Sequence, residues 1–264
     1  METKRNLKYY TAPPISIPAL IGWAIIVVGA LLLTMYATRF AGIITVIVGA
    51  LLVVMTSGGA SNDTDIEYQI SERIKNLQER SEKKHEVYEK HFLKMLKPIN
   101  LRGYDFEAKE EPFYYKKGKD GMNRTNYFMG CNLIFTNEKM FVFARRFSLI
   151  DESIDEDRTG SYFFTELDRA EIEEKVYTHK KKDRDVAVKY YIFRIFKQDG
   201  TPALEMCVDY GADTDKYAEL ISRAIVTRQK ELAKRAEEAA ARRAAFRARV
   251  EAEKAAEANG ANAE

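Results

Sequence analysis

The sequence has few of the residues that disulfide and metal chemistry require. Its 264 residues include two cysteines and three histidines. Cys131 and Cys207 each lie in an apolar stretch, so we expect buried thiols and no disulfide. None of the histidines, His85, His91 and His179, is spaced with cysteines or carboxylates as zinc ligands are. We therefore expect no metal site.

Excess charge and catalytic motifs are also scarce. The 42 Lys and Arg residues nearly balance the 40 Asp and Glu residues, and a net charge of +2 does not indicate nucleic-acid binding. The acidic stretch 151–157 lacks the glycine and the terminal glutamate of a calcium loop. The sequence contains no Gly-rich phosphate loop and no Gly-x-Ser-x-Gly turn. We expect a protein that is not an enzyme, with no cofactor and no nucleic-acid partner.

Two long apolar runs lie close to the N-terminus. Residues 15–36 and 40–57 carry no charged side chain, and each is long enough to cross a hydrocarbon core of about 30 Å as a helix. A signal peptide does not fit, because the first run is too long and a second run follows almost at once. We predict a transmembrane helical hairpin over residues 15–57, and thus an integral membrane protein with two spans.

The flanks of this hairpin indicate its orientation. The N-terminal flank, residues 1–14, is basic through Lys4, Arg5 and Lys8. The hairpin tip holds only Arg39, so the positive-inside rule places both ends in the cytoplasm. We expect a multi-pass protein of the cell (plasma) membrane with cytoplasmic N- and C-termini. Tyr9 and Tyr10 are candidate aromatic residues for the bilayer interface.

Small residues recur within both apolar runs. Gly22 and Gly29 form one row of them. Such rows let helices pack closely in lipid. We favour packing of the two helices against each other, with a seam between copies of the chain as the alternative.

Residues 58–100 are predicted to be a linker followed by an amphipathic helix. Apolar residues recur at helical spacing from Ile66 to Leu96, and Pro98 ends the pattern. Asn62 is a candidate N-cap. A helix of about thirty residues would be roughly 45 Å long. It would either cover the domain that follows or act as a spacer or dimerising coil.

Residues 101–227 are predicted to form an antiparallel β domain. Apolar residues change there from helical spacing to alternation, which is typical of strands. Two β-rich runs flank a short turn at Asn137, and a later pair of strands is joined near Gly200. The spacing becomes helical again after Asp213, which can cap that helix. We predict about six or seven strands, the first over residues 113–117, closed by a helix.

Residues 228–264 are predicted to continue that helix as a charged, Ala-rich extension that frays at its end. Three pairs of opposite charge are spaced four residues apart: Glu231 with Arg235, Glu238 with Arg242, and Arg247 with Glu251. A solvated helix explains this pattern. The alternative is a partner-binding helix that uses Phe246 and Val250.

The order of strands followed by a helix resembles the pleckstrin-homology superfold, and is similar to bacterial PH-like families that occur with paired membrane helices. The resemblance rests on NLIFTNEKMFVF at residues 132–143, FFTELDRAEI at 163–172, IFRIFKQDG at 192–200 and DTDKYAELISRAIV at 213–226. It covers roughly residues 113–226. The long helix expected before the strands departs from the simplest members.

The resemblance implies an α+β protein with a binding or scaffolding role and no inherited catalytic residues. The expected function is to hold a protein partner, or further copies of the chain, at the membrane surface. Members that bind phosphoinositides carry basic residues around the first pair of strands. Here the comparable residues are Lys116, Lys117, Lys119 and Arg124. A sensor of anionic lipid headgroups is therefore the alternative function, and a solvated turn is the simpler interpretation of these four residues.

Overall fold

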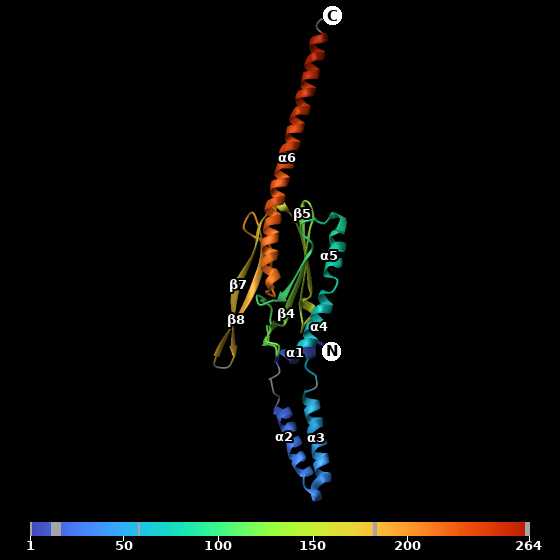
Figure 1. The fold of residues 1–264 in the computed structure, drawn as a ribbon, viewed down its shortest axis with the longest axis vertical. Helices are drawn as coiled ribbons and strands as arrows, with labels where there is room; N and C mark the ends of the chain where they lie inside the picture. The colour runs from blue at the N-terminus through green and yellow to red at the C-terminus, as the bar shows by residue number, and fades with distance from the viewer. Residues whose placement is uncertain (1, 12–16, 58, 182–183, 262–264) are drawn as a thin grey trace.

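The computed structural model describes residues 2–11, 17–57, 59–181 and 184–261. The chain forms an elongated molecule, in which a helical hairpin, a β domain and a long C-terminal helix follow one another along one axis (Figure 1). The helical hairpin and the tip of the last helix lie at opposite ends. The structure is α+β with antiparallel sheets, which confirms the predicted class.

The helical hairpin consists of α2 (Ile17–Leu33), the 3-10 turn η1 (Tyr36–Thr38) and α3 (Arg39–Ser57). Glycines line the contact between its two helices. A Cβ atom on Gly22 would lie 3.1 Å from the carbonyl oxygen of Gly49, and one on Gly29 would lie 3.1 Å from that of Gly42. These distances are too short for most side chains, so glycine lets the two backbones approach. The glycine row therefore serves the packing of the hairpin against itself, as favoured from the sequence.

The prediction of two membrane spans is met only in part. Among the described residues, Tyr36–Met55 is the one helical stretch long and apolar enough to cross a membrane, with a hydropathy of 2.2. The 17 residues of α2 reach only about 26 Å as a helix. Residues 15 and 16, where the first span was expected to begin, lie outside the described residues. Large apolar side chains on both helices are exposed, such as Leu31 and Phe40.

Three short helices pack around the β domain: α1 (Glu2–Thr11), α4 (Asp63–Ile74) and α5 (Leu77–His85). Asn62 caps α4, since its side chain accepts a hydrogen bond from the backbone of Asp65. The predicted single helix of about thirty residues is wrong. The helix is interrupted at Asn76, whose φ of 58° is left-handed. A 3-10 turn, η2 (Glu89–His91), follows α5.

α4 and α5 cover the sheet that contains residues 127–135 and 139–148. This decides between the two roles considered for residues 58–100. Ile66 and Ile70 are fully buried, and Leu77 is nearly so. A Cβ atom on Gly130 of the sheet would lie 2.9 Å from Ile74. The missing side chain at Gly130 thus makes room for the end of α4. The segment is a covering element, as one of the two alternatives predicted.

The described residues contain nine strands. They are β1 (Ile99–Tyr104), β2 (Tyr115–Lys117), β3 (Asn123–Thr125), β4 (Tyr127–Phe135), β5 (Lys139–Ser148), β6 (Glu156–Phe163), β7 (Leu167–Lys181), β8 (Arg184–Lys197) and β9 (Pro202–Val208). One sheet has the order β1-β4-β5-β6, another β7-β8-β9, and β2 pairs with β3 in a small hairpin. Two 3-10 turns, η3 (Glu152–Ile154) and η4 (Phe164–Glu166), flank β6. The sequence missed β1, which precedes the first strand expected.

The two larger sheets enclose the main core and meet where β1 lies beside β9. The backbone N–H of Asp209 donates to the carbonyl of Arg102 at 2.8 Å. A Cβ atom on Gly103 would lie 2.6 Å from the backbone of Val208, so glycine is required for this approach. The predicted turns at Asn137 and Gly200 join β4 to β5 and β8 to β9.

The C-terminal helix α6 (Ala212–Ala261) runs for 50 residues without a break. Ile221 and Ile225 are fully buried against the main core, and the Ser222 hydroxyl bonds to the backbone of Ala170 in β7. Contact with the β domain continues beyond the predicted boundary at residue 227. Arg228 donates to the carbonyl of Asn137. The tail at residues 262–264 lies outside the described residues.

Candidate functional site

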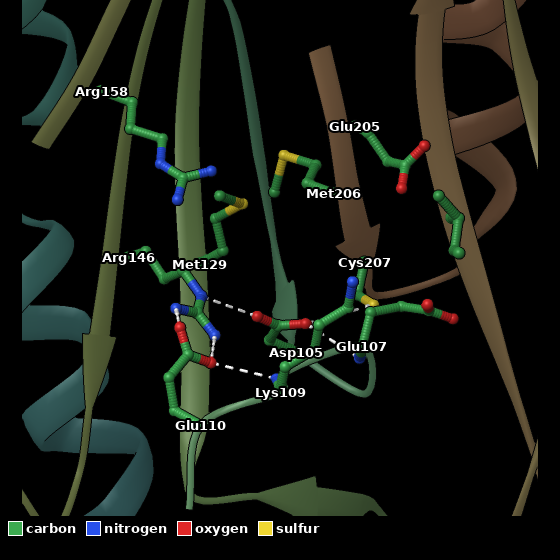
Figure 2. Close-up of a pocket in the computed structure, with 11 residues that line it drawn as sticks. Asp105, Glu107, Lys109, Glu110, Met129, Arg146, Arg158, Glu205, Met206 and Cys207 are labelled. Carbon is green, nitrogen blue, oxygen red and sulfur yellow. Dashed lines mark hydrogen bonds and ion pairs between the residues drawn. The ribbon is translucent and has the colours of Figure 1, made fainter. Parts of the chain in front are cut away.

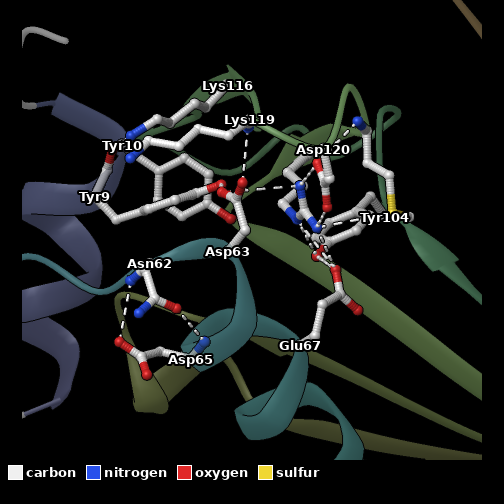
Figure 3. Close-up of polar contacts among 12 residues, drawn as sticks. Tyr9, Tyr10, Asn62, Asp63, Asp65, Glu67, Tyr104, Lys116, Lys119 and Asp120 are labelled. Carbon is white, nitrogen blue, oxygen red and sulfur yellow. Dashed lines mark hydrogen bonds and ion pairs between the residues drawn. The ribbon is translucent and has the colours of Figure 1, made fainter.

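An ion-pair cluster lies at the end of the β domain that faces the helical hairpin. Figure 3 shows the side chains of Glu67, Tyr104 and Asp120 converging there from α4, β1 and the β2–β3 turn. At its centre is Arg124 of β3, whose side chain is 0% exposed. Its Nη2 lies 2.6 Å from Asp120 Oδ2 and 2.9 Å from Glu67 Oε1, and its Nε donates to the Tyr104 hydroxyl at 3.1 Å. Three elements are therefore joined through one guanidinium.

The charges of this cluster persist at neutral pH. Burial alone would lower the pKa of Arg124, but its hydrogen bonds to Asp120 and Glu67 raise that pKa well above its usual value. The hydrogen bond from Arg124 lowers the pKa of Asp120 to about 2. Burial would raise the pKa of Asp63, yet hydrogen bonds from the Tyr9 hydroxyl and from the Lys119 backbone lower it overall. This ion-paired cluster of Arg124, Asp120, Glu67 and Asp63 is the joint that holds α4 and the β2–β3 turn together.

The N-terminal helix α1 is attached to this joint. Asn6 is 1% exposed, and its Nδ2 donates to the carbonyl of Leu149 at 2.7 Å. The Tyr9 hydroxyl donates to Asp63 at 2.6 Å, and the Tyr10 hydroxyl donates to the carbonyl of Thr125 at 2.5 Å. Tyr9 and Tyr10 are buried in the β domain, so they do not lie at the bilayer interface as expected. Their hydrogen bonds to α4 and β3 hold both tyrosines in the β domain instead.

The docking of α1 lies within residues 1–14, which were predicted only as a flank. A signal was present in the sequence. Asn6, Tyr9 and Tyr10 share one face of a ten-residue helix, whereas Lys4 and Lys8 share the opposite face. The partners of the first face are far away in the sequence, so this signal alone could not identify them.

The four basic residues predicted for headgroup binding do not form one exposed site. Arg124 turns inward, and a lipid phosphate cannot reach a guanidinium that is fully buried, so the predicted headgroup contact of Arg124 is wrong. The ammonium of Lys116 is half-buried, lies 3.9 Å from the centre of the Tyr9 ring and donates to the Tyr9 carbonyl. Burial lowers the pKa of Lys116. Lys117 and Lys119 are exposed on the same β2–β3 hairpin.

A cleft of about 300 Å³ opens between the two larger sheets (Figure 2). Arg146 of β5 lies on one wall and is 7% exposed. Its Nε donates to Asp105 at 2.8 Å, and its two Nη atoms donate to the two carboxylate oxygens of Glu110. These bonds lower the pKa of Glu110 to about 2. The Arg146 guanidinium is therefore fully paired with these two carboxylates.

The cysteines are both free and buried, as predicted. Cys207 lines the cleft, where burial raises the pKa of its thiol to about 12. Burial raises the pKa of the Cys131 thiol as well. Both thiols are protonated at neutral pH and are poor nucleophiles. Within the part of the chain that the structure describes, no group of three or more His, Cys, Asp or Glu side chains could hold a metal ion.

The second candidate region is the part of α6 that leaves the β domain. Leu232 is the last residue of this helix that packs against the main core. Beyond it the helix projects away from the helical hairpin (Figure 1). Phe246 is 69% exposed there, and Arg242, Arg243 and Arg247 surround it. The structure pairs Glu231 with Arg228, whereas the sequence predicted a pair with Arg235.

Comparison with known proteins gives no relative for this chain. No protein-family model matches it. No curated protein matches it. No solved structure matches it.

Proposed function

We propose that this chain is a membrane-anchored adaptor, in which the helical hairpin crosses the membrane twice and the β domain displays α6 to a protein partner or to further copies of the chain. The observation that carries the proposal is the projection of α6. Beyond Leu232 the helix continues for about thirty residues, or about 45 Å, and the side chains of residues 233–249 are all exposed. A helix that only closed the domain would end where its apolar face ends.

The arrangement of the strands supports a PH-like domain as part of this proposal. A four-stranded antiparallel sheet is followed by a three-stranded one and then by a helix packed against β7. This is the order expected from the resemblance. In such a module the loops and helix carry recognition, while the sheets provide a rigid support.

Two features support membrane anchoring with both ends on one side of the membrane, and the basic N-terminal flank favours the cytoplasmic side. The apolar side chains of α2 and α3 point outward, which suits lipid rather than water. The residues before and after the helical hairpin meet on the same side of it, because the Ser61 hydroxyl donates to Asn6 at 2.6 Å. The first span, α2, crosses the hydrocarbon core if the bilayer thins slightly.

Photo-crosslinking in membranes of cells that express the full chain tests the proposal. A photoreactive benzoylphenylalanine would replace Phe246 in one variant and Val226 in a control variant. Val226 is 46% exposed on the part of α6 that closes the domain. We expect a discrete adduct from position 246, absent from position 226. Its mass distinguishes another protein from a second copy.

A chain that ends at residue 232 is the second control. It keeps Arg228 and Leu232, which contact the β domain, and removes only the projecting part. It should enter the membrane normally and lose the partner in co-purification. Absence of any adduct at position 246 above that at position 226 would overturn the adaptor proposal.

A further inference from the structure

The N-terminal helix α1 has two chemically different faces. Asn6, Tyr9 and Tyr10 are buried against the β domain. The opposite face, formed by Lys4, Leu7, Lys8 and Thr11, is exposed. Leu7 is 39% exposed at the edge of this face, beside Lys4. Lysines on one exposed face suit contact with the anionic headgroups of a bilayer.

This exposed face is turned toward the membrane end of the molecule. Figure 1 shows α1 between the β domain and the helical hairpin. The Nζ atom of Lys8 lies 3.3 Å from the position that a Cβ atom on Gly59 would occupy. Gly59 follows α3 by two residues, so Lys8 lies where the chain leaves the proposed second span.

The β2–β3 hairpin extends the same surface. Lys116 is held against the ring of Tyr9 in α1, and the backbone N–H of Lys119 donates to Asp63 at 2.6 Å. Figure 3 shows Lys116 and Lys119 beside Tyr9 and Tyr10. The side chain of Lys119 therefore lies next to α1, and the cluster around Arg124 fixes the two elements to each other. Lys117 is exposed on the same hairpin, on the face opposite Lys116.

The surface carries lysines that are not held in ion pairs. Within the described residues, none of the four exposed lysines, Lys4, Lys8, Lys117 and Lys119, forms an ion pair. Arg5 is different, because it lies 3.5 Å from Asp65. The nearby Asp63 and Asp120 already bond to Tyr9 and Arg124. The four ammonium groups are thus free to contact anions.

We infer that Lys4, Leu7, Lys8, Lys117 and Lys119 form a platform that lies against the anionic headgroups of the bilayer and fixes the orientation of the β domain. This platform differs from the headgroup site predicted from sequence, since it excludes Lys116 and Arg124 and includes α1. The ligand is the anionic bilayer surface as a whole, which attracts a cluster of lysines held within a Debye length of it. The inference rests on the proposed insertion of the helical hairpin.

Fluorescence quenching in vesicles tests the platform with the full chain. Met122→Cys in the β2–β3 turn provides the labelling site, because its side chain is 42% exposed whereas the two native cysteines are buried. A fluorophore at this position is measured in proteoliposomes that contain a headgroup-linked quencher. The vesicles are either pure phosphatidylcholine or a mixture with phosphatidylglycerol.

We expect stronger quenching in the anionic vesicles, and loss of the difference between the two lipids in 1 M salt, where the Debye length is about 3 Å. The variant K4Q/K8Q/K117Q/K119Q should also lose this difference. The matched control is K84Q/K90Q/K94Q/K97Q, which removes the same charge from exposed lysines on α5 and the segment after it. This control should quench like the parent protein.

Equal quenching in both lipids, or an unchanged response of the platform variant, would overturn the platform. The proposed insertion is checked in the same samples by flotation of the vesicles in alkaline carbonate. A chain that fails to float refutes membrane insertion and the platform together. A chain that floats without lipid-dependent quenching refutes the platform alone.

Discussion

Replacing Arg124 with methionine should release α1 from the β domain. Loss of one partner from a buried ion pair costs about 3–5 kcal/mol. The side chains of Glu67 and Asp120 are 36% and 40% exposed, so water can rehydrate them after the replacement. This lowers the expected cost to about 2–3 kcal/mol. The cost falls on the joint between α1, α4 and the β2–β3 turn.

Hydrogen exchange of the full chain in lipid nanodiscs measures this release. A loss of about 2–3 kcal/mol in a local opening equilibrium corresponds to a roughly hundredfold faster exchange of the affected amides. We expect this acceleration in α1 and in the first turns of α4. The distant strands β7 and β8 should exchange as in the parent protein.

Arg146→Met is the matched control. Arg146 is also a buried arginine, and its ion pairs are with the carboxylates of Asp105 and Glu110, neither of which belongs to α1. Its replacement should accelerate exchange around the cleft and leave α1 protected. Equal protection of α1 in both variants would refute the reasoning, because α1 would then be held by Asn6 and its tyrosines without the ion-pair cluster.

Three further predictions concern two carboxylates, the helical hairpin and the base of α6. Asp120 and Glu110 have folded-state pKa values of about 2, below unfolded values near 4. Their contribution to stability is therefore complete above about pH 4 and is lost toward about pH 2, so the thermal midpoint should fall over that interval, less steeply in a D120N/E110Q variant. Gly29→Val should destabilise the helical hairpin in detergent by about 1–3 kcal/mol through overpacking, whereas Ala30→Val, exposed on the same helix, should not. A chain truncated after residue 232 should have the same thermal midpoint as the parent protein. A chain truncated after residue 225 should have a lower midpoint, because it loses the bonds of Arg228 and Gln229 to the β domain.

Local patterns predicted those parts of the fold that depend on neighbours in the sequence. The apolar runs predicted the helical hairpin, and the turns at Asn137 and Gly200 predicted pairs of strands that the structure contains. Asn62 was a candidate cap, and it accepts the expected bond. In each case the signal lies in residues that are close together in the sequence, so composition and spacing were sufficient.

Features that depend on distant partners could not be predicted in this way. The break at Asn76 lets the chain follow the sheet where Gly130 makes room for Ile74, and no local signal requires it. Arg124 resembles an exposed turn residue, yet one of its carboxylate partners is Glu67, which lies 57 positions earlier. The candidate site differs from the prediction for this reason. Of the predicted basic cluster, Arg124 is buried in ion pairs, whereas Lys117 and Lys119 are exposed.

The unbroken helix α6 also determines how orientation at the membrane affects reach. Its first part is clamped to the β domain at Ser222, Arg228 and Gln229, so the projecting part cannot swing independently at its base. Over a lever of about 45 Å, a domain tilt of about 20° would move the tip by about 15 Å. If the β domain were held loosely, the tip of α6 would reach a wide range of heights above the bilayer. If the domain were fixed, that range would be narrow. The height at which a partner is captured would thus be set by contacts at the opposite end of the molecule.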